Sequence, residues 1–187
     1  MERLKDVDPL LAIAKVLVIF LQVVTGIAVI AVLIAIPVVM TQHDQFAQAL
    51  SEGASNLPLW QGMAAIGLFL LAVAVLVASL FWFFRLLGRI IDTVGARDPF
   101  TPENAHRLWV MGWIALGVQV GSFLIEALGY FIGTVFPSGV GEDNWHFTVD
   151  GDFVFSGNGI VLAVVLFILS RVFRKGAEMR DDLEGTV

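Results

Sequence analysis

The 187-residue sequence contains no cysteine. This absence excludes disulfide bonds, thiolate metal sites and catalysis by a cysteine thiol. The sequence also lacks the spacings HExxH and GxSxG, a glycine-rich phosphate loop, and a recognisable pair of nucleophile and base. The sequence has no stripe of basic residues with interleaved aromatic residues, the pattern that follows a nucleic-acid backbone. We therefore expect no enzyme, no bound cofactor and no direct contact with nucleic acid.

Charged residues are scarce, at 15% of the chain, whereas 58% of the residues are hydrophobic and the mean hydropathy is +0.86. So little polar surface cannot cover a water-soluble globule. The apolar residues gather in four runs, and a helix of each run rises about 1.5 Å per residue, enough to cross a hydrocarbon core of about 30 Å. These predicted spans cover residues 10–36, 59–84, 108–136 and 153–173. We predict an all-α integral membrane protein with four transmembrane helices, and the lipid bilayer as its first partner.

Lys and Arg are absent from two connections between these runs, residues 37–58 and 137–152. All eleven lie in the remaining segments: Arg3, Lys5, Lys15, Arg85, Arg89, Arg97, Arg107, Arg171, Arg174, Lys175 and Arg180. Short loops rich in Lys and Arg stay in the cytoplasm, so this distribution predicts that both termini are cytoplasmic. The loop 85–107 and the tail 174–187 then lie inside, and residues 1–187 form one domain.

Local signals predict that helices continue beyond the spans on the basic side. Apolar residues recur at helical spacing through residues 85–94, and Gly95 follows as a helix end. Thr101, Pro102 and Glu103 form a strong helix start, with Thr as the N-cap and Pro at the first helical position. Residues 171–183 extend the last helix with a mixed-charge face.

The two outer connections contain weaker signals. Aromatic and β-branched residues flank Asp150-Gly151, a pair preferred where both turn residues need positive φ, which predicts a small outer β-hairpin. Alternatively, residues 153–155 simply begin the fourth helix. Phe46 and Leu50 lie among polar residues of the other connection, which is compatible with one amphipathic turn on the membrane or with a plain loop. His43 and His146, with nearby acids, would suit a divalent metal, although no fixed ligand spacing supports that site.

Small and polar residues recur at spacings of three and four along the third run, so they form a stripe that faces protein rather than lipid. This stripe contains Gly112, Ala115, Gln119, Ser122, Glu126, Gly129 and Gly133. Gln22 on the first run lies at a depth similar to that of Gln119, and Asn158 begins the fourth run near its outer end. We predict an intramembrane polar cluster that consists of Gln22, Gln119, Ser122, Glu126 and Asn158.

Glu126 has two interpretations. An ionisable residue inside a span costs roughly 2.5–3.5 kcal/mol on insertion scales, which makes it a functional hypothesis by default. The structural interpretation is that a protonated carboxyl joins two helices through a hydrogen bond to an amide or a carbonyl. The first interpretation leads to a small oligomeric transporter or channel that uses Glu126 in a proton or cation pathway.

Two stretches, residues 98–108 (DPFTPENAHRL) and 172–187 (VFRKGAEMRDDLEGTV), resemble a bacterial four-helix inner-membrane family that is catalogued only as a domain of unknown function. The resemblance implies the fold and a location in the bacterial inner membrane. Many members of that family are encoded beside a short Cro/C1-type helix-turn-helix regulator, which hints at such a regulator as a partner. The resemblance brings no catalytic residues.

Both stretches lie on the predicted cytoplasmic side, where a substrate pathway would not need them. The first functional expectation is therefore a membrane sensor or anchor for a cytoplasmic regulator, and the transporter or channel is the alternative. The predicted partner surface consists of Arg89, Arg97, Phe100, Thr101, Asn104, Arg174, Lys175 and Leu183.

Overall fold

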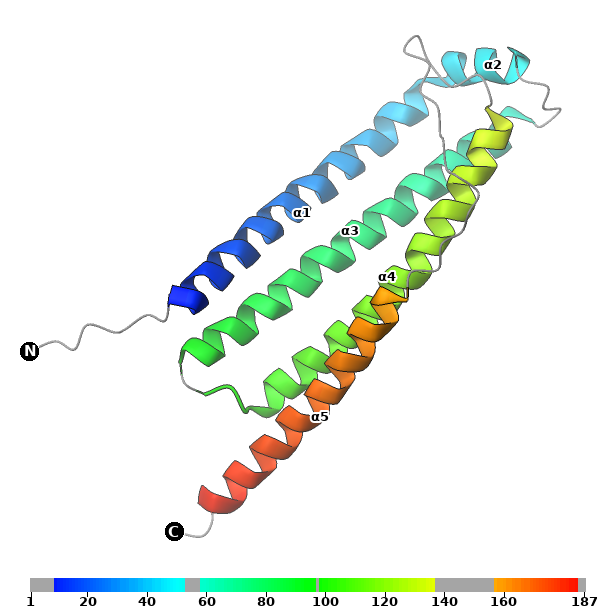
Figure 1. The fold of residues 1–187 in the computed structure, drawn as a ribbon. Coiled ribbons are helices and arrows are strands. Elements are labelled where there is room, and N and C mark those ends of the chain that lie inside the picture. The colour runs from blue at the N-terminus through cyan, green and yellow to red at the C-terminus, as the bar shows by residue number, and fades with distance from the viewer. Residues whose placement is uncertain (1–8, 53–57, 97, 137–156, 185–187) are drawn as a thin grey trace, which may run out of the picture. The chain divides into compact units, whose positions relative to one another are not determined.

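The computed structural model of the protein describes residues 9–52, 58–96, 98–136 and 157–184. These residues are almost entirely helical, and no strand occurs among them. The helices are α1 (Pro9–Thr41), α2 (His43–Glu52), α3 (Leu59–Gly95), α4 (Pro102–Val135) and α5 (Asn158–Glu184) (Figure 1). The prediction of an all-α protein is confirmed, whereas the predicted hairpin lies outside the described residues.

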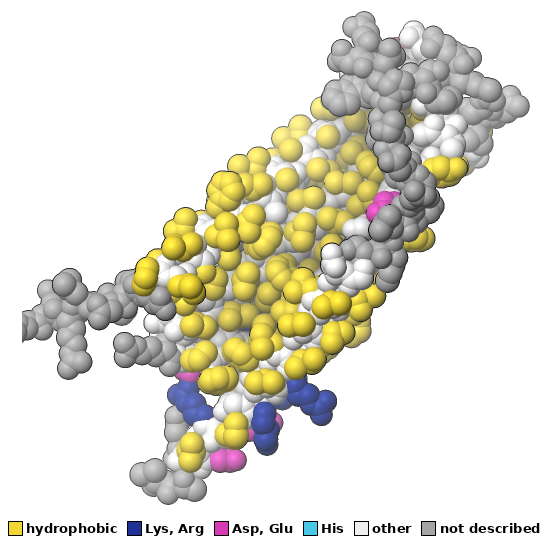
Figure 2. All heavy atoms as spheres, in the orientation of Figure 1, with side chains coloured by type: hydrophobic (Ala, Val, Ile, Leu, Met, Phe, Trp, Pro, Cys, Tyr) yellow, Lys and Arg dark blue, Asp and Glu magenta, His cyan; other side chains and the backbone are white. Residues whose placement is uncertain are grey.

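Among the described helices, α1, α3 and α4 are long and apolar enough to cross a membrane. The mean hydropathy of their most apolar windows is 2.9, 2.8 and 1.8, and at most 22% of each window is buried inside the protein. Figure 2 shows hydrophobic side chains over most of the helix surface that faces the viewer. Such surfaces require an apolar surrounding, so the protein is a membrane protein with spanning helices. The predicted fourth span begins outside the described residues, and α5 contains its remainder.

Several predicted helix ends are confirmed. Helix α3 continues to Gly95, and α5 continues to Glu184. Helix α4 begins at Pro102, where the backbone N–H of Asn104 donates to the Thr101 hydroxyl at 3.2 Å, the bond expected of an N-cap. Pro37 lies inside α1 rather than at its end.

The described helices form two compact units. Of the described residues, unit 1 contains 9–26, 79–96, 98–118 and 157–184, and unit 2 contains 27–52, 58–78 and 119–136. Helices α1, α3 and α4 contribute residues to both units, whereas α2 belongs to unit 2 and α5 to unit 1.

The core of unit 1 lies where α3, α4 and α5 pack together. Its buried residues are Leu86, Ile90, Leu108, Met111, Ala115, Ala163 and Leu166. Gly112 allows α5 to pack closely on α4, because a Cβ at this position would lie 2.7 Å from Cε1 of Phe167. Lys15 of α1 forms an ion pair with Asp92 of α3 at 2.7 Å and joins α1 to the same unit.

The core of unit 2 shows why residues 43–52 form a helix rather than a loop. Phe46 of α2 is buried against Ile66 of α3, Ile132 of α4 and Phe136, which directly follows α4. The rings of Phe46 and Phe136 meet edge to face, with centroids 5.8 Å apart. This aromatic contact fixes the amphipathic helix on the ends of α3 and α4.

Candidate functional site

Asn104 organises the connection between α3 and α4 in unit 1. Its amide nitrogen donates to the Thr93 hydroxyl at 2.6 Å and to the Pro99 carbonyl at 2.9 Å, and its oxygen accepts a bond from Arg107 at 2.7 Å. The side chain is fully buried. Because its polar atoms are used internally, Asn104 orders the connection rather than offering a free polar group, and its place in the predicted partner surface stays a prediction.

Helix α5 is fastened to this connection by two contacts. Arg180 forms an ion pair with Asp98. The Phe100 ring lies 5.2 Å from the Phe173 ring, centroid to centroid, and occupies the space beside Gly176. A Cβ on Gly176 would lie 2.7 Å from Cδ1 of Phe100, so only glycine permits this approach.

A buried hydrogen bond completes the connection. The Ser170 hydroxyl of α5 donates to the Ala105 carbonyl of α4 at 2.7 Å, and both residues are buried. Residues 98–108 and 172–184, which are far apart in the sequence, therefore lie together in unit 1. We call the exposed part of these two segments the motif surface.

Other predicted partner residues have varied environments. Phe100 is 44% exposed and Leu183 is 71% exposed, so both contribute apolar area to the motif surface. Arg174 and Lys175 are exposed on α5. Thr101 is half-buried as the N-cap of α4. Two further arginines complete the prediction: Arg89, which is exposed on α3, and Arg97, which lies outside the described residues.

Sequence reasoning missed Met179, which is 54% exposed on α5. It precedes Leu183 by four residues, so the two apolar side chains share one helix face among charged residues. This i, i+4 spacing was the available signal.

Lys175 is held in its charged form by a neighbour on the same helix. Its ammonium group lies 3.0 Å from a carboxylate oxygen of Glu178. The hydrogen bond and the negative charge of Glu178 raise the pKa of Lys175 above its usual value. Lys175 is therefore a cation at neutral pH, but one whose charge is largely balanced.

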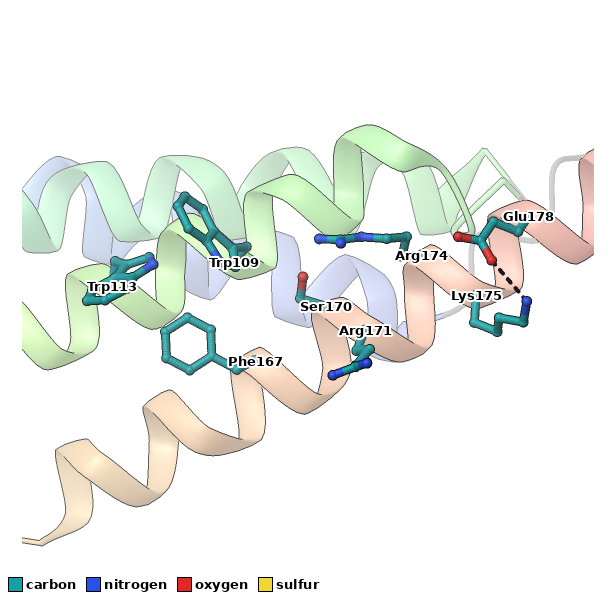
Figure 3. A pocket seen from close by; sticks show the side chains of 8 residues that line it. All are labelled: Trp109, Trp113, Phe167, Ser170, Arg171, Arg174, Lys175 and Glu178. Carbon is teal, nitrogen blue, oxygen red and sulfur yellow. Dashed lines mark hydrogen bonds and ion pairs between the residues drawn. The ribbon is translucent and has the colours of Figure 1, made fainter.

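A groove of about 680 Å³ opens between α4 and α5 in unit 1 (Figure 3). One end is aromatic and the other is charged. It is lined by Trp109, Trp113, Phe167, Ser170, Arg171, Arg174, Lys175 and Glu178. The sequence signals were two pairs at helical spacing, Trp109 with Trp113 and Arg171 with Arg174. Only the fold brings the two pairs together.

The predicted intramembrane polar cluster is divided between the units. Gln22 is half-buried on α1 and Asn158 is exposed at the start of α5, both in unit 1. Gln119, Ser122 and Glu126 are half-buried on α4 in unit 2. Because the cluster draws on both units, it stays a prediction.

The suggested outer metal site draws on residues 142–146, which lie outside the described residues. Within the part of the chain that the structure describes, no group of three or more His, Asp or Glu side chains is arranged to hold a metal ion. His106 is exposed and stacks on Trp109, with ring centroids 5.9 Å apart.

Comparisons with known proteins identify the family. A search of curated proteins and a search of solved structures each returned no match. A family model described as "Protein of unknown function (DUF2975)" matches residues 47–187, which include α3, α4, α5 and the motif surface. This match covers well over half of the chain. The protein therefore belongs to this family of unknown function, which confirms the resemblance found in residues 98–108 and 172–187.

Proposed function

We propose that the protein is a membrane anchor or sensor that binds a cytoplasmic regulator through the motif surface. The observation that carries this proposal is the joining of residues 98–108 and 172–184 by an ion pair and an aromatic contact, supported by the buried hydrogen bond from Ser170, just before the second segment, to Ala105. These contacts lie beyond the apolar runs, and a helix does not need them to span a bilayer. A pre-ordered surface does favour binding, because less conformational entropy is lost when the partner arrives.

The proposal includes a membrane orientation. Four spans, the last of which includes the first part of α5, place both termini in the cytoplasm of a bacterium and the protein in its inner membrane. Every Lys and Arg among the described residues belongs to unit 1, which supports a basic cytoplasmic end. Reporter fusions at the two termini test this orientation, and periplasmic reporter activity at either terminus would contradict it.

The chemistry of the motif surface indicates how a partner would bind. Met179 and Leu183 form an exposed apolar pair on a charged helix, and Phe100 adds exposed aromatic area from the connection. Helices with this pattern bind by laying their apolar side chains into a groove that is rimmed by charge. A short helix-turn-helix regulator, the class of partner implied by the resemblance, would present such a groove from its own helical domain.

The test is co-purification of the full-length protein in nanodiscs with the regulator encoded beside it. The variant Met179→Ser with Leu183→Ser removes the apolar pair without touching the ion pair, the aromatic contact or the buried hydrogen bond. We expect this variant to lose the regulator and to keep its thermal stability, because both side chains are exposed.

Val94→Ser is the matched control, since Val94 is also exposed, at 38%, near the end of α3. This variant should retain the regulator. Wild-type protein that captures no regulator, or a double variant that captures as much as wild type, would refute the proposal.

A further inference from the structure

The groove between α4 and α5 has an aromatic end that is open to the surroundings. Trp109 and Trp113 of α4 are 44% and 54% exposed, and their ring centroids are 6.0 Å apart. Phe167 of α5 lies edge to face with Trp113 at 5.7 Å, and the absence of a side chain on Gly112 lets it lie deep in the groove. Exposed indoles of this kind are typical of the membrane–water interface.

The other end of the groove has an excess of positive charge. The only acid among its lining residues, Glu178, is bonded to Lys175. Arg171 and Arg174 are exposed, and no described residue forms an ion pair with either. In Figure 3 the nitrogen ends of both arginines point back along α5 toward the aromatic end, whereas Lys175 points to Glu178. Two such guanidinium groups match the oxygen atoms of a phosphate group.

The two ends follow one another along α5. Phe167 precedes Arg171 by four residues and Arg174 by seven, so at about 1.5 Å per residue the arginines lie about 6 and 10 Å farther along the helix. In the orientation proposed above, the aromatic end lies deeper in the bilayer and the arginines reach the inner headgroups. This order of apolar and charged groups is that of a phospholipid.

A second groove, of about 550 Å³ between α3 and α4, does not offer the same combination. Its lining includes Arg89 and Arg107, but Arg107 is bonded to Asn104, and Glu103 lines the same groove. The first groove is therefore the stronger site for an anionic ligand.

We propose that the groove between α4 and α5 binds one anionic phospholipid of the cytoplasmic leaflet. Its phosphate lies between Arg171 and Arg174, and the upper part of an acyl chain covers Trp109 and Phe167. A volume of about 680 Å³ suits a molecule larger than a phosphate ion, which would leave the aromatic end uncovered. Basic pockets between spanning helices on the cytoplasmic side are a recurring form of lipid recognition. The inference rests on the proposed orientation but not on a regulator.

The test uses quenching of tryptophan fluorescence by brominated lipids. Trp60, Trp82 and Trp145 are replaced by Phe in the full-length protein, so that Trp109 and Trp113 alone report on the groove. In mixed bilayers, brominated phosphatidylglycerol should quench this pair more strongly than brominated phosphatidylcholine. The binding constant for phosphatidylglycerol relative to phosphatidylcholine should be roughly 25, because each arginine near an anionic headgroup contributes about fivefold.

The decisive comparison is between two variants with equal loss of charge. Arg171→Gln with Arg174→Gln should bring the relative binding constant close to one. Arg85→Gln with Arg89→Gln removes two exposed arginines that do not line this groove, and it should leave the preference unchanged. Native mass spectrometry of the protein with all its tryptophans, counting retained anionic lipids, provides the same comparison independently.

Equal lipid preference in all three proteins, or an equal decrease in both double variants, would overturn the proposal. Reversal of the quenching by millimolar inorganic phosphate would assign the site to a free phosphate instead and would also overturn it. The regulator is not present in this experiment, and the reporter fusions check the orientation separately. A failure here is therefore distinguishable from a failure of the proposed function.

Discussion

Asn104→Ala is predicted to be among the most destabilising substitutions in residues 98–108 and 172–184. It removes two hydrogen bonds donated by the amide, to Thr93 and Pro99, and one accepted from Arg107. Each such bond contributes about 1 kcal/mol net. Arg107 and Pro99 are half-buried and can recover water, so we expect a total loss of about 2–3 kcal/mol rather than the larger cost of stranded buried groups.

Thermal unfolding in detergent measures this loss. For a chain of this size, about 2–3 kcal/mol corresponds to a decrease in Tm of roughly 5–10 °C. His106→Ala is the matched control, because His106 is exposed two residues later on the same helix, and we expect its effect to stay within about 0.5 kcal/mol. If Asn104→Ala unfolds at the same temperature as His106→Ala, the buried hydrogen-bond network does not stabilise the connection and the reasoning is refuted.

Three further predictions follow from the structure. Gly112→Ala should place a methyl group against the Phe167 ring and destabilise by about 1–3 kcal/mol, measured as a lower Tm; an unchanged Tm would mean that α5 can move away freely. If the Glu126 carboxyl joins two helices by a hydrogen bond, Glu126→Gln should keep the stability of the protein in detergent, whereas Glu126→Leu should lose about 1–2 kcal/mol. A proton or cation flux in proteoliposomes that is lost in Glu126→Gln would instead favour the transporter. The pKa of Lys175 is raised above 10.5, so the stabilisation from its pair with Glu178 is present at neutral pH and is lost as the pH rises through that pKa. The difference in Tm between wild type and Glu178→Gln should therefore be small and constant near neutrality. It should disappear at more alkaline pH.

Local sequence signals predicted the local features of the fold. The end of α3 at Gly95 and the start of α4 at Pro102 depend on neighbouring residues, so they were readable from the sequence. For α2 the sequence left an amphipathic turn and a plain loop as alternatives, because the helix depends on the contact of Phe46 with Phe136, ninety residues away in the sequence. Tertiary packing of an amphipathic face, rather than propensity, decides whether so short a segment is helical.

The functional residues divide in the same way. Asn104 was assigned to the partner surface because it lies in residues 98–108, one of the stretches that carry the resemblance. Its burial depends on where the fold places Thr93 and Pro99 around its amide, and the sequence alone does not show that arrangement. The groove was missed for a similar reason, since neither the tryptophans of α4 nor the arginines of α5 form a site alone. The stretches that carried the resemblance were visible in the sequence, and their contact was not.

The Phe100 ring beside Gly176 has a consequence for how α5 can move. Glycine occurs in α5 only at positions 159 and 176, so the ring has a single place near this end where the helix has no side chain. Sliding α5 by one turn, about 5.4 Å, would bring the ring against Val172 or Arg180 instead, and would break the Arg180–Asp98 ion pair at the same time. The Phe100 ring therefore allows α5 only one axial position relative to the connection between α3 and α4. Any signal passed through α5 must either keep that position or release Phe100 completely.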